Sequence, residues 1–225
     1  SDDELSAFFS GFRYRFFGGE DLAALLSAVR NARRAYGSLE ALFRAGDDPA
    51  EPTILRGADR FAAALEDLAG DRWTRPSGKS AWRDNLLPRP SRGSACKRLF
   101  LYLRWMVRKD AVDPGGWTGV SPARLIVPLD THMGAACRRL GLLARKADDL
   151  RAALEVTEAF RRFRPDDPVR YDFALTRPGI IPAWTQTSTF GASRVVVRTL
   201  GKEAALDPQG EDMVDFSGAQ GRDGQ

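Results

Sequence analysis

Apolar residues recur at spacings of three and four through the first seventy residues, and this period predicts a run of four amphipathic helices. The first is expected over residues 2–12, with an apolar face made of Leu5, Phe8, Phe9 and Phe12. The second, over residues 19–36, begins with acidic residues, ends with arginines and stops at Gly37, as the helix dipole and glycine C-caps favour. Ser38 and Thr53 are placed to cap the third and fourth helices. The apolar faces of all four are expected to lie in the core.

The strongest helical pattern covers residues 94–108, where the apolar stripe is wide enough for a helix that is buried on most sides. Ser94 is a suitable N-cap for this helix, and it would place Lys97 at the third helical position. The next helix is expected over residues 130–140, with Asp130 as its N-cap.

Two further helices are expected from about residues 148 and 166, each with acids at its start. These elements predict an all-α protein with two lobes of helices and a functional site in the cleft between them. We expect residues 1–180 to form this helical domain. Residues 181–225 are expected to be an irregular tail, in which residues 193–200 have the pattern of a lone strand. No apolar run approaches the roughly 20 residues that a membrane span needs, so no membrane partner is expected.

The net charge of +4 is unevenly distributed along the chain. Residues 89–151 hold 13 Lys and Arg against 5 Asp and Glu, a local charge of +8. Positive charge of this density is typical of a surface that binds phosphate groups, and the alternative is ordinary solvated helix faces. The charge pattern therefore indicates nucleic acid as a partner.

Residues 70–93 lack helical periodicity and place two large aromatic residues, Trp73 and Trp82, among arginines and a lysine. Such interleaving suits a nucleic-acid groove, because rings stack on bases while cations contact phosphates. The alternative is that both rings pack this long loop onto the core.

Few residues are available for metal or disulfide chemistry. The chain has two cysteines, Cys96 and Cys137, and one histidine, His132, too few for a disulfide framework, an iron–sulfur cluster or a zinc site with several His or Cys ligands. We expect a cytoplasmic protein that uses no metal and no cofactor.

Lys97 and Asp130 are the candidate catalytic residues, each at an expected helix start. Unpaired amide groups and partial burial would favour the neutral amine of Lys97, which can form a Schiff base. An N-cap aspartate stays ionised and oriented, so it can activate a nucleophile or stabilise an oxocarbenium ion. The alternatives are a surface lysine and a purely structural cap. His132 is a possible helper of undefined role.

The segment VPLDTHMGAACRRLGL resembles the P-x-D-T-H segment, with its following R-L-G, of the helix-hairpin-helix DNA glycosylase superfamily. The resemblance implies that Asp130 is catalytic and that an upstream lysine attacks the sugar C1′, displaces the base and cuts the strand by β-elimination. KRLFLYLRWM resembles the lysine-bearing helix of the archaeal 8-oxoguanine glycosylases, which assigns that role to Lys97. Lys109, 21 residues before Asp130, is the rival nucleophile at the end of the same helix.

Residues 8–180 also resemble a bacterial family of unknown function placed in this superfamily. Because members of that family begin further upstream, the resemblance implies that N-terminal helices are missing here. The superfamily's glycine-rich hairpin, L-P-G-x-G-x-K-T-A, is absent, so contacts to the DNA phosphates are expected to be built differently.

The leading hypothesis is a monomeric, nucleoid-associated DNA glycosylase and abasic-site (AP) lyase that acts on double-stranded DNA with an oxidised purine, 8-oxoguanine foremost. The candidate phosphate-binding residues are Arg92, Ser94, Arg98, Arg138 and Arg139. The candidate base-stacking residues are Trp73, Trp82, Trp105 and Trp117. The alternatives are a non-catalytic nucleic-acid-binding module and a monofunctional glycosylase for another lesion.

Overall fold

The computed structural model describes residues 1–14, 17–73 and 86–180, so the strand expected over residues 193–200 lies outside it. In these residues the secondary structure is almost entirely helical, which confirms the predicted all-α class. The exceptions are short 3₁₀ turns and a small antiparallel hairpin of β1 (Arg13–Tyr14) and β2 (Phe17–Gly18). None of the described helices combines the length and the apolar character of a membrane span.

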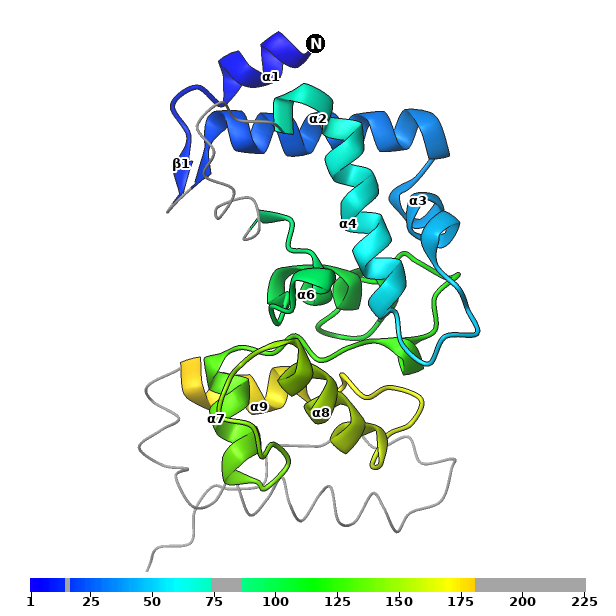
Figure 1. The fold of residues 1–225 in the computed structure, drawn as a ribbon, viewed down its shortest axis with the longest axis vertical. Helices are drawn as coiled ribbons and strands as arrows, with labels where there is room; N and C mark the ends of the chain where they lie inside the picture. Colours follow the sequence, from blue (N-terminus) through cyan, green and yellow to red (C-terminus); the bar gives the residue numbers. More distant parts are fainter. Residues whose placement is uncertain (15–16, 74–85, 181–225) are drawn as a thin grey trace, which may run out of the picture.

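The described residues of the N-terminal half form four α-helices. They are α1 (Asp2–Phe8), α2 (Gly19–Tyr36), α3 (Leu39–Gly46) and α4 (Leu55–Ala69). As predicted, α2 ends at Gly37, whose φ of 80° favours glycine, and the Ser38 hydroxyl caps α3 by accepting from the amide of Ala41. In Figure 1, α4 descends from the level of α2 towards the centre of the molecule.

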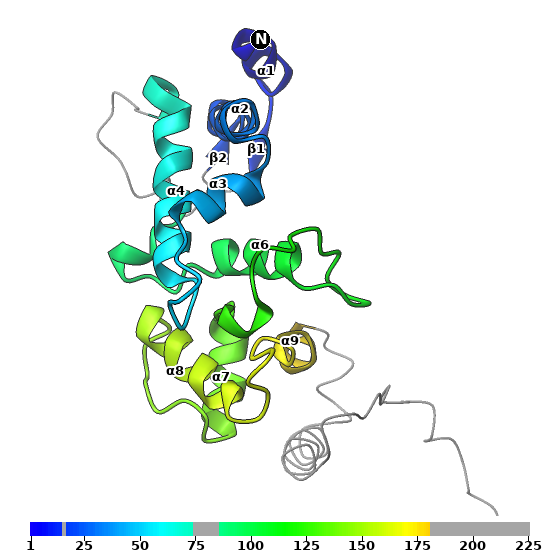
Figure 2. The same cartoon turned by 90° about the vertical axis from the view of Figure 1, so that its right-hand side faces the viewer.

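The C-terminal half contains the other four described α-helices. They are α6 (Lys97–Val107), α7 (Thr131–Arg139), α8 (Leu150–Arg161) and α9 (Asp172–Ile180). Three short 3₁₀ turns, η1 (Gly70–Trp73), η3 (Pro90–Arg92) and η4 (Pro122–Arg124), lie in the connections. Figures 1 and 2 show α7, α8 and α9 grouped together, with α6 between this group and α1–α3 and beside the lower part of α4.

One continuous core joins the two groups through α6. The buried residues Phe100 and Leu103 of α6 belong to the same cluster as Phe43 of α3 and Phe160 of α8. The apolar segment before Asp130 is also buried and forms no strand. The prediction that α6 lies centrally is confirmed.

The apolar face predicted for the first helix is not buried. Phe8 is 80% exposed and Phe12 is 42% exposed, and α1 contains no buried residue. This seven-residue helix is held to α2 mainly by polar contacts, since the Asp2 carboxylate accepts from Ser27 and pairs with Arg30. The last helix was also predicted six residues too early, because residues 166–171 form turns and α9 begins at Asp172.

A network of buried ion pairs joins the C-terminal end of α6 to the segments that follow it. Arg104 donates to Asp113 (Nε–Oδ2, 3.0 Å) and pairs with Asp172 of α9. Arg108, just past the end of α6, pairs with Asp113 and donates to both oxygens of Asp167 at 3.0 Å. Asp113 is completely buried, so these charges depend on one another for compensation.

Candidate active site

Lys97 and Asp130 lie in direct contact although 33 residues separate them. The Lys97 Nζ donates to Asp130 Oδ2 at 2.6 Å. The other carboxylate oxygen, Oδ1, accepts from the backbone amide of Met133 at 2.8 Å, which is the N-cap bond of α7. Both oxygens of Asp130 are therefore held, one by the helix and one by the amine.

The start of α6 differs from the prediction. Cys96, and not Ser94, occupies the N-cap position, so Lys97 is the first residue of the helix rather than the third. Cys96 has φ 46° and ψ 35°, and it is the one non-glycine residue with positive φ in the described part of the chain. This conformation costs roughly 1–2 kcal/mol for a non-glycine residue. Because Cys96 is buried at 4% exposure, packing holds the backbone in place.

Asp130 is ionised at neutral pH, as expected of an N-cap aspartate. Burial raises the pKa of its carboxyl, but the hydrogen bonds from Lys97 and from the Met133 amide outweigh burial and leave the pKa below its usual value. Electrostatic interactions with Lys97 and His132 also lower this pKa. The site therefore contains a fixed negative charge beneath an amine.

Lys97 is more exposed than its carboxylate partner. Its side chain is 45% exposed, whereas that of Asp130 is 16% exposed. The amine therefore lies at the surface, where a large substrate can reach it, and the carboxylate lies below it.

Lys109 does not share this site. At about 1.5 Å of rise per residue, the ten steps of α6 from Lys97 to Val107 span about 15 Å, and Lys109 lies beyond that far end. Its neighbour across an isolated bridge is Pro114. The geometry thus selects Lys97 over Lys109 as the partner of Asp130.

Most of the chain matches one protein family. The protein family described as "Protein of unknown function (DUF2400)" matches residues 1–181. The chain belongs to this family. No curated protein and no solved structure matches the chain.

In this DUF2400 member, the surroundings of the pair are basic and accessible. His132 is exposed in the first turn of α7, two residues after Asp130, whose carboxylate caps this helix. Arg98 is exposed beside Lys97, with its guanidinium carbon 5.5 Å from the centre of the Phe17 ring. Arg92 in η3 and Ser94 in the following turn are also exposed. Among the described residues, no group of three or more His, Cys, Asp or Glu is arranged to hold a metal ion.

Arg138 has a structural role that the sequence interpretation did not foresee. Its guanidinium donates to the carbonyls of Arg145 and Lys146 and to Asp148 Oδ1 at 2.6–2.8 Å, which fixes the loop after α7. These bonds occupy the group that was predicted to contact phosphate. Arg139, the next residue, is exposed and keeps that possibility.

The tryptophans proposed for base stacking lie in different environments. Trp73 is 6% exposed and Trp117 is 9% exposed, and Trp117 packs against Phe43 with ring centroids 5.4 Å apart. Both rings fill the core, so neither has a face free for a base. Trp105 on α6 is 43% exposed, and Trp82 lies outside the described residues.

Asp172 is a second carboxylate near the pair that the sequence interpretation did not single out. Burial raises its pKa to about 6, although Arg104 opposes that shift, and the charges of Asp130 and Lys97 also act on it. Its only sequence signal was an acid within RYDFAL, inside the helix expected from about residue 166. Burial, which sequence does not show, makes this residue unusual.

Proposed function

We propose that this DUF2400 protein is a DNA glycosylase and AP lyase that removes an oxidised purine, with 8-oxoguanine as the leading substrate. The observation that carries the proposal is the 2.6 Å contact between Lys97 Nζ and Asp130 Oδ2 at the starts of two helices. An accessible amine next to an ionised carboxylate is the minimum equipment for Schiff-base chemistry at a sugar carbon. The resemblance of the P-x-D-T-H segment to the helix-hairpin-helix glycosylases supports the same assignment.

The contact suggests how each group would act. Asp130 accepts a proton from the Lys97 ammonium, and the neutral amine then attacks C1′ of the deoxyribose. The bond from C1′ to the base nitrogen breaks, and the base leaves with the proton that Asp130 took up. The carboxylate is then ionised again, and its negative charge stabilises the positive charge that develops on the sugar. The C1′–O4′ bond then opens as one amine proton passes to O4′, which gives a Schiff base between Lys97 and C1′. Asp130 accepts a C2′ proton, and the electron pair released expels the 3′ phosphate and cuts the strand.

The position of the pair also suits a polymeric anionic substrate. The first turns of α6 and α7 present backbone amides at the positive ends of two helix dipoles, which favour phosphate groups. Arg92 and Arg98 add exposed positive charge just before and within the first turn of α6, and Arg139 adds it at the far end of α7. A target base must leave the duplex to bring C1′ to Lys97.

Borohydride trapping tests the proposal directly. A duplex with one abasic site or one 8-oxoguanine is incubated with the protein and sodium borohydride, and the covalent complex is separated by denaturing electrophoresis. We expect a complex with the wild type and none with Lys97→Ala. Lys109→Ala is the matched control, since it removes another exposed lysine of the same region and should trap normally.

The outcomes separate the proposal from its two rivals. A complex that survives Lys97→Ala, or none with either duplex, would overturn the lysine mechanism. Release of free base without strand cleavage would identify a monofunctional glycosylase. Duplex binding that neither Lys97→Ala nor Asp130→Asn changes, without base release, would identify a non-catalytic binding module.

A further inference from the structure

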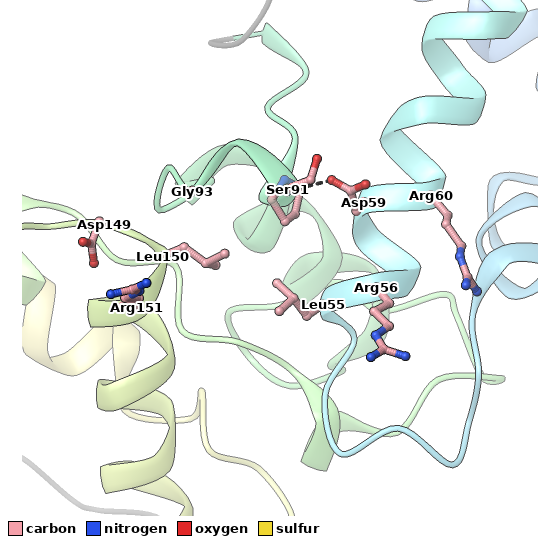
Figure 3. A pocket seen from close by; sticks show the side chains of 10 residues that line it. Leu55, Arg56, Asp59, Arg60, Ser91, Gly93, Asp149, Leu150 and Arg151 are labelled. Atoms are coloured by element: carbon pink, nitrogen blue, oxygen red, sulfur yellow. Dashed lines mark hydrogen bonds between the residues drawn. The ribbon is translucent and has the colours of Figure 1, made fainter.

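A pocket of about 620 Å³ adjoins the loop that leads into α6, and neither Lys97 nor Asp130 lines it. Three segments that are far apart in the sequence form its walls. They are the first two turns of α4, the η3 loop at Pro90 and Ser91, and the first turn of α8 at Leu150 (Figure 3). This volume is within the range of about 300–1,000 Å³ that is usual for ligand sites.

The rim of the pocket is rich in arginine. Arg56 and Arg60 stand one turn apart on α4, Arg151 stands on the first turn of α8, and all three are exposed. Arg56 pairs with Glu51 at 2.8 Å but remains 71% exposed, and Arg60 uses one N–H group on the carbonyl of Gly46. Each guanidinium therefore keeps donors for an anionic ligand.

The two carboxylates of the lining are already neutralised by arginines. Asp59 accepts from Arg89 at 2.9 Å and from the amide of Ser91 at 2.8 Å. Asp149 accepts from Arg145 at 2.7 Å and caps α8. Both carboxylates are thus paired with arginines outside the rim. The three arginines of the rim therefore give the pocket a positive potential, which attracts anions.

The floor of the pocket is apolar. Figure 3 shows Leu55 of α4 and Leu150 of α8 pointing towards one another from opposite walls, with Pro90 also in the lining. A free inorganic anion would make no favourable contact with these apolar side chains. A ligand with an anionic group on an apolar body, such as a sugar–phosphate unit, matches both parts.

The walls are joined by main-chain contacts. The amide of Leu150 donates to the carbonyl of Gly93 at 3.0 Å, and Ser94 forms an isolated bridge with Asp149. Lys97 lies four positions after Gly93, so the edge of the pocket at Gly93 lies at most about 14 Å from the backbone of that lysine. At about 3.4 Å of rise per nucleotide, a strand that passes Lys97 reaches the pocket within about four nucleotides.

We propose that this pocket binds a sugar–phosphate unit of the DNA strand, with Arg56, Arg60 and Arg151 on the phosphate and the leucines under the sugar. This inference rests on the proposed function, since it takes the strand to be the one whose base is excised. It also provides phosphate ligands in a sequence that lacks the glycine-rich hairpin, because the guanidinium groups of the three arginines take the place of the hairpin's backbone amides.

The test compares two triple variants with the same change in charge. The pocket variant is Arg56→Gln/Arg60→Gln/Arg151→Gln. The control is Arg33→Gln/Arg34→Gln/Arg162→Gln, three exposed arginines at the C-terminal ends of α2 and α8. Fluorescence anisotropy with a 20-base-pair duplex, from about 50 to 200 mM salt, gives the Kd and its salt dependence.

We expect the pocket variant to bind at least about tenfold more weakly than the wild type, with a salt slope smaller by about 1, because the loss of one phosphate contact lowers the slope by about 0.9. The control variant should keep the slope and lose less than about threefold in affinity. Equal effects of the two variants would overturn the pocket. A deoxynucleoside monophosphate that binds the wild type as tightly as the duplex would overturn its assignment to a strand.

Borohydride trapping of abasic duplex by the wild type separates the two proposals, since it tests the lyase independently of the salt slope. If the wild type shows the arginine-dependent slope but no trapping, the lyase fails and the pocket stands. If the wild type traps and the pocket variant keeps the wild-type slope, the lyase stands and the pocket fails.

Discussion

Arg104 of α6 and Asp172 of α9 form a buried ion pair, with the two side chains 3% and 7% exposed. Arg104 lies seven residues after Lys97, two turns along one face of the same helix. Asp172 begins α9, which packs against α7, the helix that Asp130 caps. The ion pair therefore ties the helix that carries the amine to the group of helices that carries the carboxylate.

Loss of Arg104 should destabilise the fold strongly. Arg104→Ala leaves Asp113 and Asp172 buried with less compensation, and breaking a buried pair of this kind costs about 3–5 kcal/mol. The control is Arg56→Ala, an arginine with 71% exposure whose loss should cost less than about 1 kcal/mol. Urea denaturation followed by circular dichroism measures both. A loss below about 1 kcal/mol for Arg104→Ala would contradict the proposed tie.

The stability should fall as Asp172 ionises. Burial raises the pKa of this carboxyl to about 6 in the folded protein, above its ordinary value of 3.8. The folded state binds the proton more tightly than the unfolded chain, so this contribution is present below about pH 4 and is lost as the pH rises to about 6. Two pKa units correspond to roughly 3 kcal/mol.

Asp172→Asn removes this titration. The difference in unfolding free energy between wild type and variant should therefore shift by roughly 2–3 kcal/mol between pH 4 and pH 7. Asp3→Asn, which changes a carboxylate with 99% exposure, should give a curve parallel to that of the wild type. Parallel curves for Asp172→Asn as well would show that the carboxyl titrates normally.

Two substitutions separate the cap of Asp130 from its charge. Asp130→Asn keeps an N-cap oxygen for the Met133 amide, so the unfolding free energy should stay within about 0.5 kcal/mol, while Asp130→Ala loses the cap and about 1 kcal/mol. Both variants should trap abasic DNA at least about a hundredfold more slowly, the lower limit usual for a lost proton-transfer group. Single-turnover trapping rates measure this. A normal rate for Asp130→Asn would reduce the residue to a structural cap.

Both thiols should be protected in the folded protein. Burial raises the pKa of the Cys96 thiol and raises that of Cys137 to about 12, with exposures of 4% and 0%. Ellman's reagent should therefore react with neither cysteine under native conditions and with both in urea. A single fast-reacting thiol in the native protein would show that the strained turn at Cys96 opens readily.

The sequence by itself determined some of the helix boundaries. Gly37, Ser38 and Asp130 end or begin helices where they were predicted to, because a cap needs only a short side chain, or a glycine, within a few residues of the backbone it satisfies. The pattern of apolar residues likewise located α6 and its central position. These signals come from residues that are close together in the sequence, so they can be recognised without knowledge of the tertiary structure.

Tertiary structure decided which residues meet and which are buried. The contact of Lys97 with Asp130 bridges 33 residues, and the choice against Lys109 depends on the length and direction of α6. The start of α6 at Cys96 was missed because packing holds a backbone conformation that local preference disfavours. Burial of Trp117 and exposure of Phe8 were missed because periodicity marks a face as apolar without showing what covers it.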